Sequence, residues 1–166
     1  MILGMTASTY TLVHVLLSVV GIGSGFVVMY GLLTGKRMNG WTALFLASTV
    51  ATCVTGFGFP FDRLLPSHKV GIVSLAALGI AIVGRYVFHL AGAWRWIYVI
   101  VSAVPLYLNV FVAVVQAFLK VPVLNAIAPN QTEPLFLLTQ LVVVAGFGVL
   151  AILAATRSRN DSVGMA

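Results

Sequence analysis

The stretch "YTLVHVLLSVVGIGSGFVVMYGLL", residues 10–33, decides the class of fold, because it contains no Asp, Glu, Lys or Arg. About 20 consecutive apolar residues allow an α-helix to cross the hydrocarbon core of a bilayer, which is about 30 Å thick. A backbone in that core must satisfy its own hydrogen bonds, and a helix does so within one segment. We therefore predict a membrane-spanning helix over residues 10–33.

Four further apolar segments follow, at residues 41–61, 70–90, 97–119 and 134–156. The chain is 61% hydrophobic and 7% charged, with a mean hydropathy of +1.11, whereas a typical soluble domain is about one quarter charged. The sequence therefore predicts an all-α integral membrane bundle of five transmembrane helices. We expect one domain over residues 1–156 and a polar tail at 157–166.

The basic residues are divided unequally between the two ends of these segments. Because cytoplasmic flanks are enriched in Lys and Arg, the division predicts an N-terminus outside the cell and a C-terminus in the cytoplasm. Six lie on the cytoplasmic side (Lys36, Arg37, Arg85, Arg95, Arg157 and Arg159) and three on the outer side (Arg63, Lys69 and Lys120).

Charge and cysteine content exclude several functional classes. The net charge is +6, but the basic residues are scattered at the ends of apolar runs and form no stripe that would bind nucleic acid. The single cysteine, Cys53, excludes an internal disulfide and a CxxC pair. No basic segment or small-residue cleavage pattern marks the first apolar run as a signal peptide, so we expect it to be retained.

Polar side chains inside membrane spans are costly and are therefore the first place to look for function. At about 1.5 Å per helical residue, five of them fall in the outer half of the bundle, and we predict a shared ligand pocket there. The alternative is ordinary hydrogen bonding between helices, worth about 0.6 kcal/mol on average. The five residues are His14, His68, Asn109, Gln116 and Gln140.

Arg85 and His89 form a second polar pair, near the predicted cytoplasmic end. Their spacing of four residues places both side chains on one helical face. Arg85 is close enough to the end of its span for the guanidinium to reach the headgroups, and His89 lies at the interface. We therefore favour an interfacial role for this pair over a ligand site.

The glycines of "GIGSGF", residues 21–26, match no phosphate-binding loop and no nucleophile turn. On a helix, Gly21 and Gly25 share a face with His14. We favour close packing against the second span, which offers small side chains at Ser48 and Thr52.

A flat cofactor, haem b or a quinone, is the alternative occupant of that glycine face. A haem would need an axial ligand, and only His14 and His68 lie at matching depths. We predict a metal site only in that case. No catalytic residue is assigned, and we favour a non-enzymatic role.

Four stretches carry a resemblance: "HVLLSVVGIGSGFVV", "LTGKRMNGWTALFLAS", "TGFGFPFDRLLPSHKVGI" and "LNVFVAVVQAFLKVP". Together the chain resembles a group of small bacterial polytopic inner-membrane proteins with no established activity. The resemblance covers most of the chain and implies a multi-pass location in the bacterial inner membrane. It carries over no functional residue.

Three functions are compatible with these observations. The leading hypothesis is a protein with an outer-half pocket for a haem, quinone or lipid-like molecule. The second is a non-catalytic accessory or assembly subunit whose glycine face contacts a membrane-complex partner or a second copy of the chain. The third is a small transporter in which Pro105 and Asn109 border a path for the solute.

Overall fold

The computed structural model describes residues 2, 4–60 and 66–163, and the side chains of these residues as far as Ser158. These ranges contain six α-helices and one π-helical segment; their only β-type pairing is an isolated bridge between Ile2 and Met5. The all-α prediction is therefore confirmed. The predicted end of the second span at Phe61, and the predicted outer flank at Arg63, lie outside the described residues.

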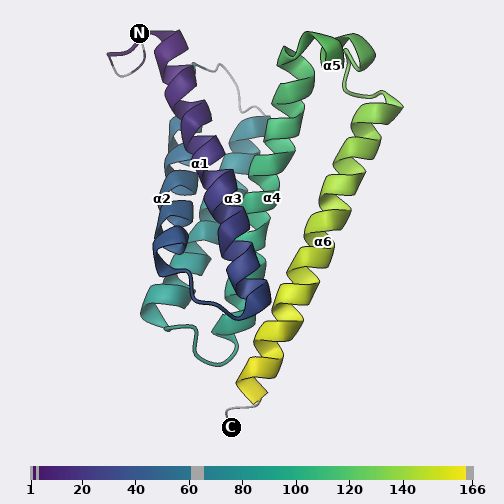
Figure 1. Ribbon diagram of the computed structural model, residues 1–166. Helices are drawn as coiled ribbons and strands as arrows, with labels where there is room; N and C mark the ends of the chain where they lie inside the picture. The colour runs from purple at the N-terminus through teal and green to yellow at the C-terminus, as the bar shows by residue number, and fades with distance from the viewer. Residues whose placement is uncertain (1, 3, 61–65, 164–166) are drawn as a thin grey trace.

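Five long helices run side by side between the two ends of the bundle (Figure 1). We call these ends the N-terminal end, where α1 begins, and the C-terminal end, where α6 ends. Each predicted span corresponds to one long helix, and the short helix α5 occupies the connection before α6. The elements are α1 (Ala7–Thr34), α2 (Asn39–Gly56), α3 (Pro66–Ile82) with its π-helical continuation η1 (Val83–Val87), α4 (Trp94–Lys120), α5 (Pro122–Ile127) and α6 (Pro134–Val163).

Four helical segments in the described part of the chain are long and apolar enough to cross a membrane. They are Ala7–Thr34, Pro66–Val87, Trp94–Lys120 and Pro134–Ser158. The remaining long helix, α2, has 18 residues, and its hydroxyl side chains make it less apolar. The chain is thus a helical membrane protein with four candidate spans, against the five that we predicted.

The interior is built from side chains of all five long helices. Its largest cluster of buried hydrophobic residues includes Val28 of α1, Phe45 of α2, Leu78 of α3, Leu106 of α4 and Phe147 of α6. Most other large apolar side chains, especially on α6, are exposed. In a bilayer such side chains face lipid, so the exposed apolar surface is consistent with the membrane assignment.

Two glycines of α1 lie at the contact between α1, α2 and α4. A Cβ atom added to Gly21 would lie 3.0 Å from Oγ1 of Thr49, and one added to Gly25 would lie 3.0 Å from the ring of Phe45 and 2.5 Å from Cδ1 of Leu106. Neither glycine could carry a side chain without moving its neighbours. The glycine face therefore packs on α2 and α4, the arrangement that we favoured; a flat cofactor at this face stays a prediction.

A matched pair of substitutions tests this packing. Gly25→Leu should lower the free energy of unfolding by about 1–3 kcal/mol, because the added side chain overpacks the contact with Phe45 and Leu106. Gly23→Leu is the control, since a Cβ at Gly23 has no neighbour within 4 Å; leucine should be neutral or stabilising there. Thermal unfolding in detergent measures both variants, and equal losses would contradict the proposed contact.

Candidate functional site

The two histidines predicted to form the outer pocket lie near the N-terminal end and are engaged in packing contacts. Nδ1 of His14 is 2.8 Å from Oγ1 of Thr55, and its ring meets the edge of Phe59 at 5.3 Å between centroids. His68 is buried and stacks on Phe57 at 5.4 Å between centroids. Each histidine thus contacts a different aromatic ring at or beyond the end of α2.

The three predicted amides are dispersed. Nδ2 of Asn109 is buried beside Gly21, 3.5 Å from the position of an added Cβ, and has no hydrogen-bond partner among the described residues. Nε2 of Gln140 donates to the backbone oxygen of Phe111 at 3.2 Å and joins α6 to α4. Gln116 is exposed. Gln140 and His14 therefore hold helices together, which is the alternative role considered for these residues.

No contact described at this end gathers the predicted residues around one space. The described residues also contain no group of three or more His, Cys, Asp or Glu side chains placed to hold a metal ion. A haem or quinone near His14 stays a prediction to which the structure adds no supporting contact.

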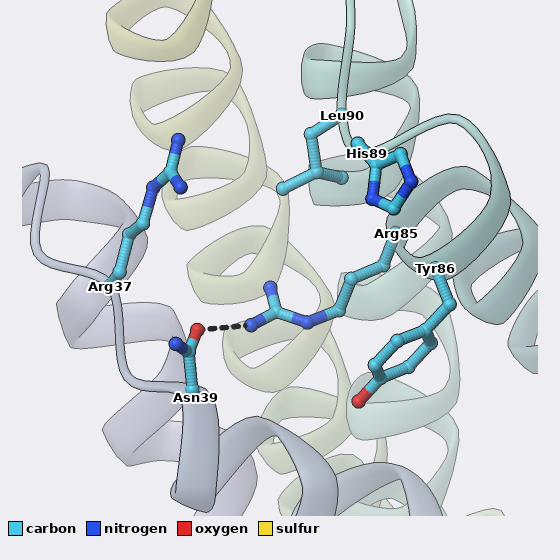
Figure 2. A pocket seen from close by; sticks show the side chains of 6 residues that line it. All are labelled: Arg37, Asn39, Arg85, Tyr86, His89 and Leu90. Atoms are coloured by element: carbon cyan, nitrogen blue, oxygen red, sulfur yellow. Dashed lines mark hydrogen bonds between the residues drawn. The ribbon is translucent and has the colours of Figure 1, made fainter.

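A cavity of about 380 Å³, with polar residues in its lining, lies instead at the C-terminal end (Figure 2). Arg85 extends across it from η1 toward the start of α2, and Arg37 and His89 stand on opposite sides of the space. The lining residues are Arg37, Asn39, Arg85, Tyr86, His89 and Leu90. They come from the α1–α2 connection, the start of α2, and the end of η1 with the turn that follows it.

The backbone of that turn has an unusual conformation. The helix widens into the π-helical segment η1, where the N–H of Phe88 donates to the oxygen of Val83 at 3.1 Å. It then closes through a bond from the N–H of Leu90 to the oxygen of Gly84 at 3.0 Å. His89 and Leu90 have φ values of 49° and 58°, a left-handed conformation that costs a non-glycine residue about 1–2 kcal/mol. Such strained positions and π-helical turns cluster at functional sites.

Aromatic packing holds the turn in place. The ring of Phe88 stacks on that of Trp94 at 4.3 Å between centroids and 6° between planes. Trp94 also lies so close to Gly84 that an added Cβ would come within 2.8 Å of the indole. The indole of Trp94 thus fills the space over η1, and its packing offsets the conformational strain at His89 and Leu90.

Arg85 is the central cation of the cavity. One Nη atom donates to Oδ1 of Asn39 at 2.7 Å, and the guanidinium carbon lies 5.8 Å from the ring centroid of Tyr86 and 5.6 Å from that of Tyr98. These contacts orient the side chain and leave it half-buried. A guanidinium carries five N–H donors in a planar fork, and the bond to Asn39 uses one of them.

The described charged residues that line the cavity have one sign. Arg37 and Arg85 both line it, and none of the six lining residues, all of them within the described part of the chain, carries a carboxylate. Arg157 of α6 approaches the α1–α2 connection, with its guanidinium within 3.7 Å of the position of a Cβ on Gly35, but it does not line the cavity. Two arginines, an amide and an imidazole can together bind an anion. They do not form the nucleophile-and-base pair that covalent catalysis would require.

A second cavity, of about 330 Å³, adjoins the first along the contact between α2 and α3. Its lining is apolar apart from the phenol of Tyr86, which belongs to both cavities. The residues that line it are Ala43, Leu46, Ala47, Val50, Ile82 and Tyr86. We call this second cavity the apolar groove and the first the cationic pocket.

Comparisons of the chain with protein-family models, with curated proteins and with solved structures give no match. What the protein does is therefore inferred from its own geometry.

From the sequence, Arg85 and His89 are predicted to be an interfacial pair, and neither Arg37 nor Asn39 is predicted to be a site residue. In the structure the pair does share one side of a cavity. The predicted helical face is not the cause, because His89 lies beyond the π-helical turn. No glycine stands at either left-handed position to signal that turn. The sequence signal that could have indicated Arg37 and Asn39 is the short α1–α2 connection, in which these two residues flank Met38.

Substitutions at His89 separate backbone strain from side-chain function. His89→Gly should raise the melting temperature or leave it unchanged, since glycine is preferred at left-handed positions after a helix. His89→Ala, which removes the same imidazole but keeps the strain, should be less stable than His89→Gly by about 1 kcal/mol. Thermal unfolding measures the difference, and equal stability of the two variants would show that the turn is not strained.

Proposed function

We propose that this chain is a five-span protein of the bacterial inner membrane that binds a phosphate group in the cationic pocket at the cytoplasmic end of its bundle. The observation that carries the proposal is Arg85, held by Asn39 across a cavity that Arg37 and His89 also line and that contains no carboxylate among its described lining residues. Anion binding, rather than chemistry at the anion, is what these side chains support.

Phosphate suits the pocket better than a simple halide does. The planar fork of arginine can donate two parallel hydrogen bonds to two oxygens of one phosphate. Asn39 contributes an amide and His89 an imidazole, both of which can donate to further oxygens. A cavity of about 380 Å³ also has room for more than a single atom.

Three observations support the proposed topology. Four hydroxyl residues of α2, Thr42, Ser48, Thr49 and Thr52, are buried inside the bundle, so these polar groups are not exposed to lipid. Helix α2 also packs along α1 and α3, which are both candidate spans. The excess of arginine at the C-terminal end supports a cytoplasmic location for that end.

Thermal stabilisation by inorganic phosphate tests the anion site. In an uncharged detergent at constant ionic strength, phosphate should raise the melting temperature of the protein, with about 1.4 kcal/mol of stabilisation at ten times its Kd. Arg85→Gln should weaken this binding about tenfold or more, since a charge-assisted hydrogen bond is worth about 1.5–3 kcal/mol. Arg85→Lys should recover part of the effect, because it keeps the charge and loses the fork.

Arg95→Gln is the matched control for that experiment. Arg95 lies in the first turn of α4 at the same end of the bundle but does not line the pocket. Its loss should leave the phosphate effect intact. The proposal is wrong if phosphate does not stabilise the wild-type protein, or if both glutamine variants lose the effect equally.

Reporter fusions test the path of the chain through the membrane. Alkaline phosphatase, which is active only outside the cytoplasm, should be inactive when fused after residue 38 and active when fused after residue 60, because α2 lies between the two points. Equal activity of the two fusions would show that α2 does not cross, and the reverse pattern would invert the proposed orientation.

A further inference from the structure

We infer that the phosphate belongs to an anionic phospholipid, whose headgroup occupies the cationic pocket while one acyl chain lies in the apolar groove between α2 and α3. This inference rests on the proposed function, since it names the molecule that carries the phosphate. The two cavities adjoin, and they differ in chemistry in the same way as the two parts of a lipid.

The first argument is Tyr86, the residue that the two cavities share. This residue lines both of them, and its ring faces the guanidinium of Arg85 at 5.8 Å. Tyrosine has an apolar ring and a polar hydroxyl, which suits the boundary between headgroups and hydrocarbon. A molecule that fills both cavities must change from charged to apolar at this ring.

The second argument is the position of the cavities along the bundle. Arg85 and Asn39 lie at the end of α3–η1 and the start of α2, so the cationic pocket sits at the level of the headgroups of one leaflet. The apolar groove extends from there along α2 through Ala43, Ala47 and Val50, toward the middle of the membrane. Basic pockets between helices at this level are a recognised arrangement for anionic lipid headgroups.

The third argument is the shape of the groove. Ala43 and Ala47 are exposed residues one helical turn apart on α2, and their small side chains leave room beside the larger Ile82 of α3. An acyl chain gains little free energy from moving out of bulk lipid into this groove, because both environments are equally apolar. The headgroup contacts therefore supply the affinity, and the groove selects for a molecule that has a chain.

Free phosphate and an acidic peptide are the competing occupants, and the groove argues against both. Neither has a hydrocarbon chain that would occupy the apolar groove beside the anion site. The inference commits to a membrane lipid, and the experiment distinguishes the other sources.

The test uses the full-length protein in nanodiscs of phosphatidylcholine that contain a minority of phosphatidylglycerol. Native mass spectrometry after extraction counts the phosphatidylglycerol molecules that remain bound. The wild-type protein should retain phosphatidylglycerol in preference to phosphatidylcholine. Arg85→Gln should reduce the retained phosphatidylglycerol about tenfold, the factor that corresponds to loss of one charge-assisted hydrogen bond.

Filling the groove separates this inference from the proposed function. Ala47→Phe should reduce phosphatidylglycerol retention several-fold, because the ring occupies the space of the chain, and should leave stabilisation by inorganic phosphate unchanged. Ala43→Leu, which fills the same groove with a smaller side chain, serves if the phenylalanine variant does not fold. Ala145→Phe, at an exposed position of α6 outside both cavities, is the matched control.

Each outcome has one reading. Loss with Ala47→Phe but not with Ala145→Phe, together with normal phosphate stabilisation, supports the lipid. Retention by both Ala47→Phe and Ala145→Phe, with loss in Arg85→Gln, overturns the placement of an acyl chain in the groove, and with it the inference as stated, and leaves a site that holds the phosphate group alone. Equal losses in both alanine variants indicate non-specific annular lipid and also overturn the inference. If Arg85→Gln alters neither lipid retention nor phosphate stabilisation, the proposed function itself is wrong.

Discussion

The close approach of α1 to α2 and α4 is the contact on which the rest of the bundle depends. Between helices in a membrane, lipid is as apolar as the side chains, so burial of apolar surface gives little driving force and dispersion contacts must be dense. Gly21 and Gly25 allow that density, because Thr49, Phe45 and Leu106 occupy the space where a side chain would otherwise stand. The remaining helices are arranged around α1, α2 and α4.

The polar groups have different surroundings along the bundle. At its middle and N-terminal parts, His14 bonds with Thr55 and Gln140 bonds with the backbone of α4, so these side chains serve to join helices. At the C-terminal end, the guanidinium of Arg85 crosses between two elements and lines an open cavity with donors remaining. Polar side chains that are similarly costly to place in a membrane thus have different roles at the two ends of the bundle.

The sequence predicted the helices well, because a continuous run of apolar residues is enough to indicate each of them. A long apolar run such as residues 10–33 specifies a helix in lipid regardless of its neighbours, and the glycine face of Gly21 and Gly25 follows from helical periodicity. The predicted end of the second span was less accurate, since α2 ends at Gly56. There the apolar "FGFPF" (residues 57–61) continues the hydropathy signal beyond the helix.

The candidate site could not be predicted in the same way, because it depends on contacts between elements. The interfacial reading of Arg85 and His89 treated each as an isolated side chain near a membrane surface. Only the folded chain brings Asn39 to the guanidinium and Trp94 onto Gly84. No glycine marks the left-handed conformations of His89 and Leu90, and residues other than glycine adopt such conformations uncommonly.

The left-handed turn at His89 and Leu90 has a consequence for recognition. Its conformational cost is incurred when the chain folds, so the walls of the cationic pocket are in place before the proposed anion binds. Binding to a preorganised cavity loses less conformational entropy than binding that must order a loop. The turn therefore lowers the stability of the fold but keeps the pocket preorganised. A flexible glycine-rich loop of the same length would not provide this preorganisation.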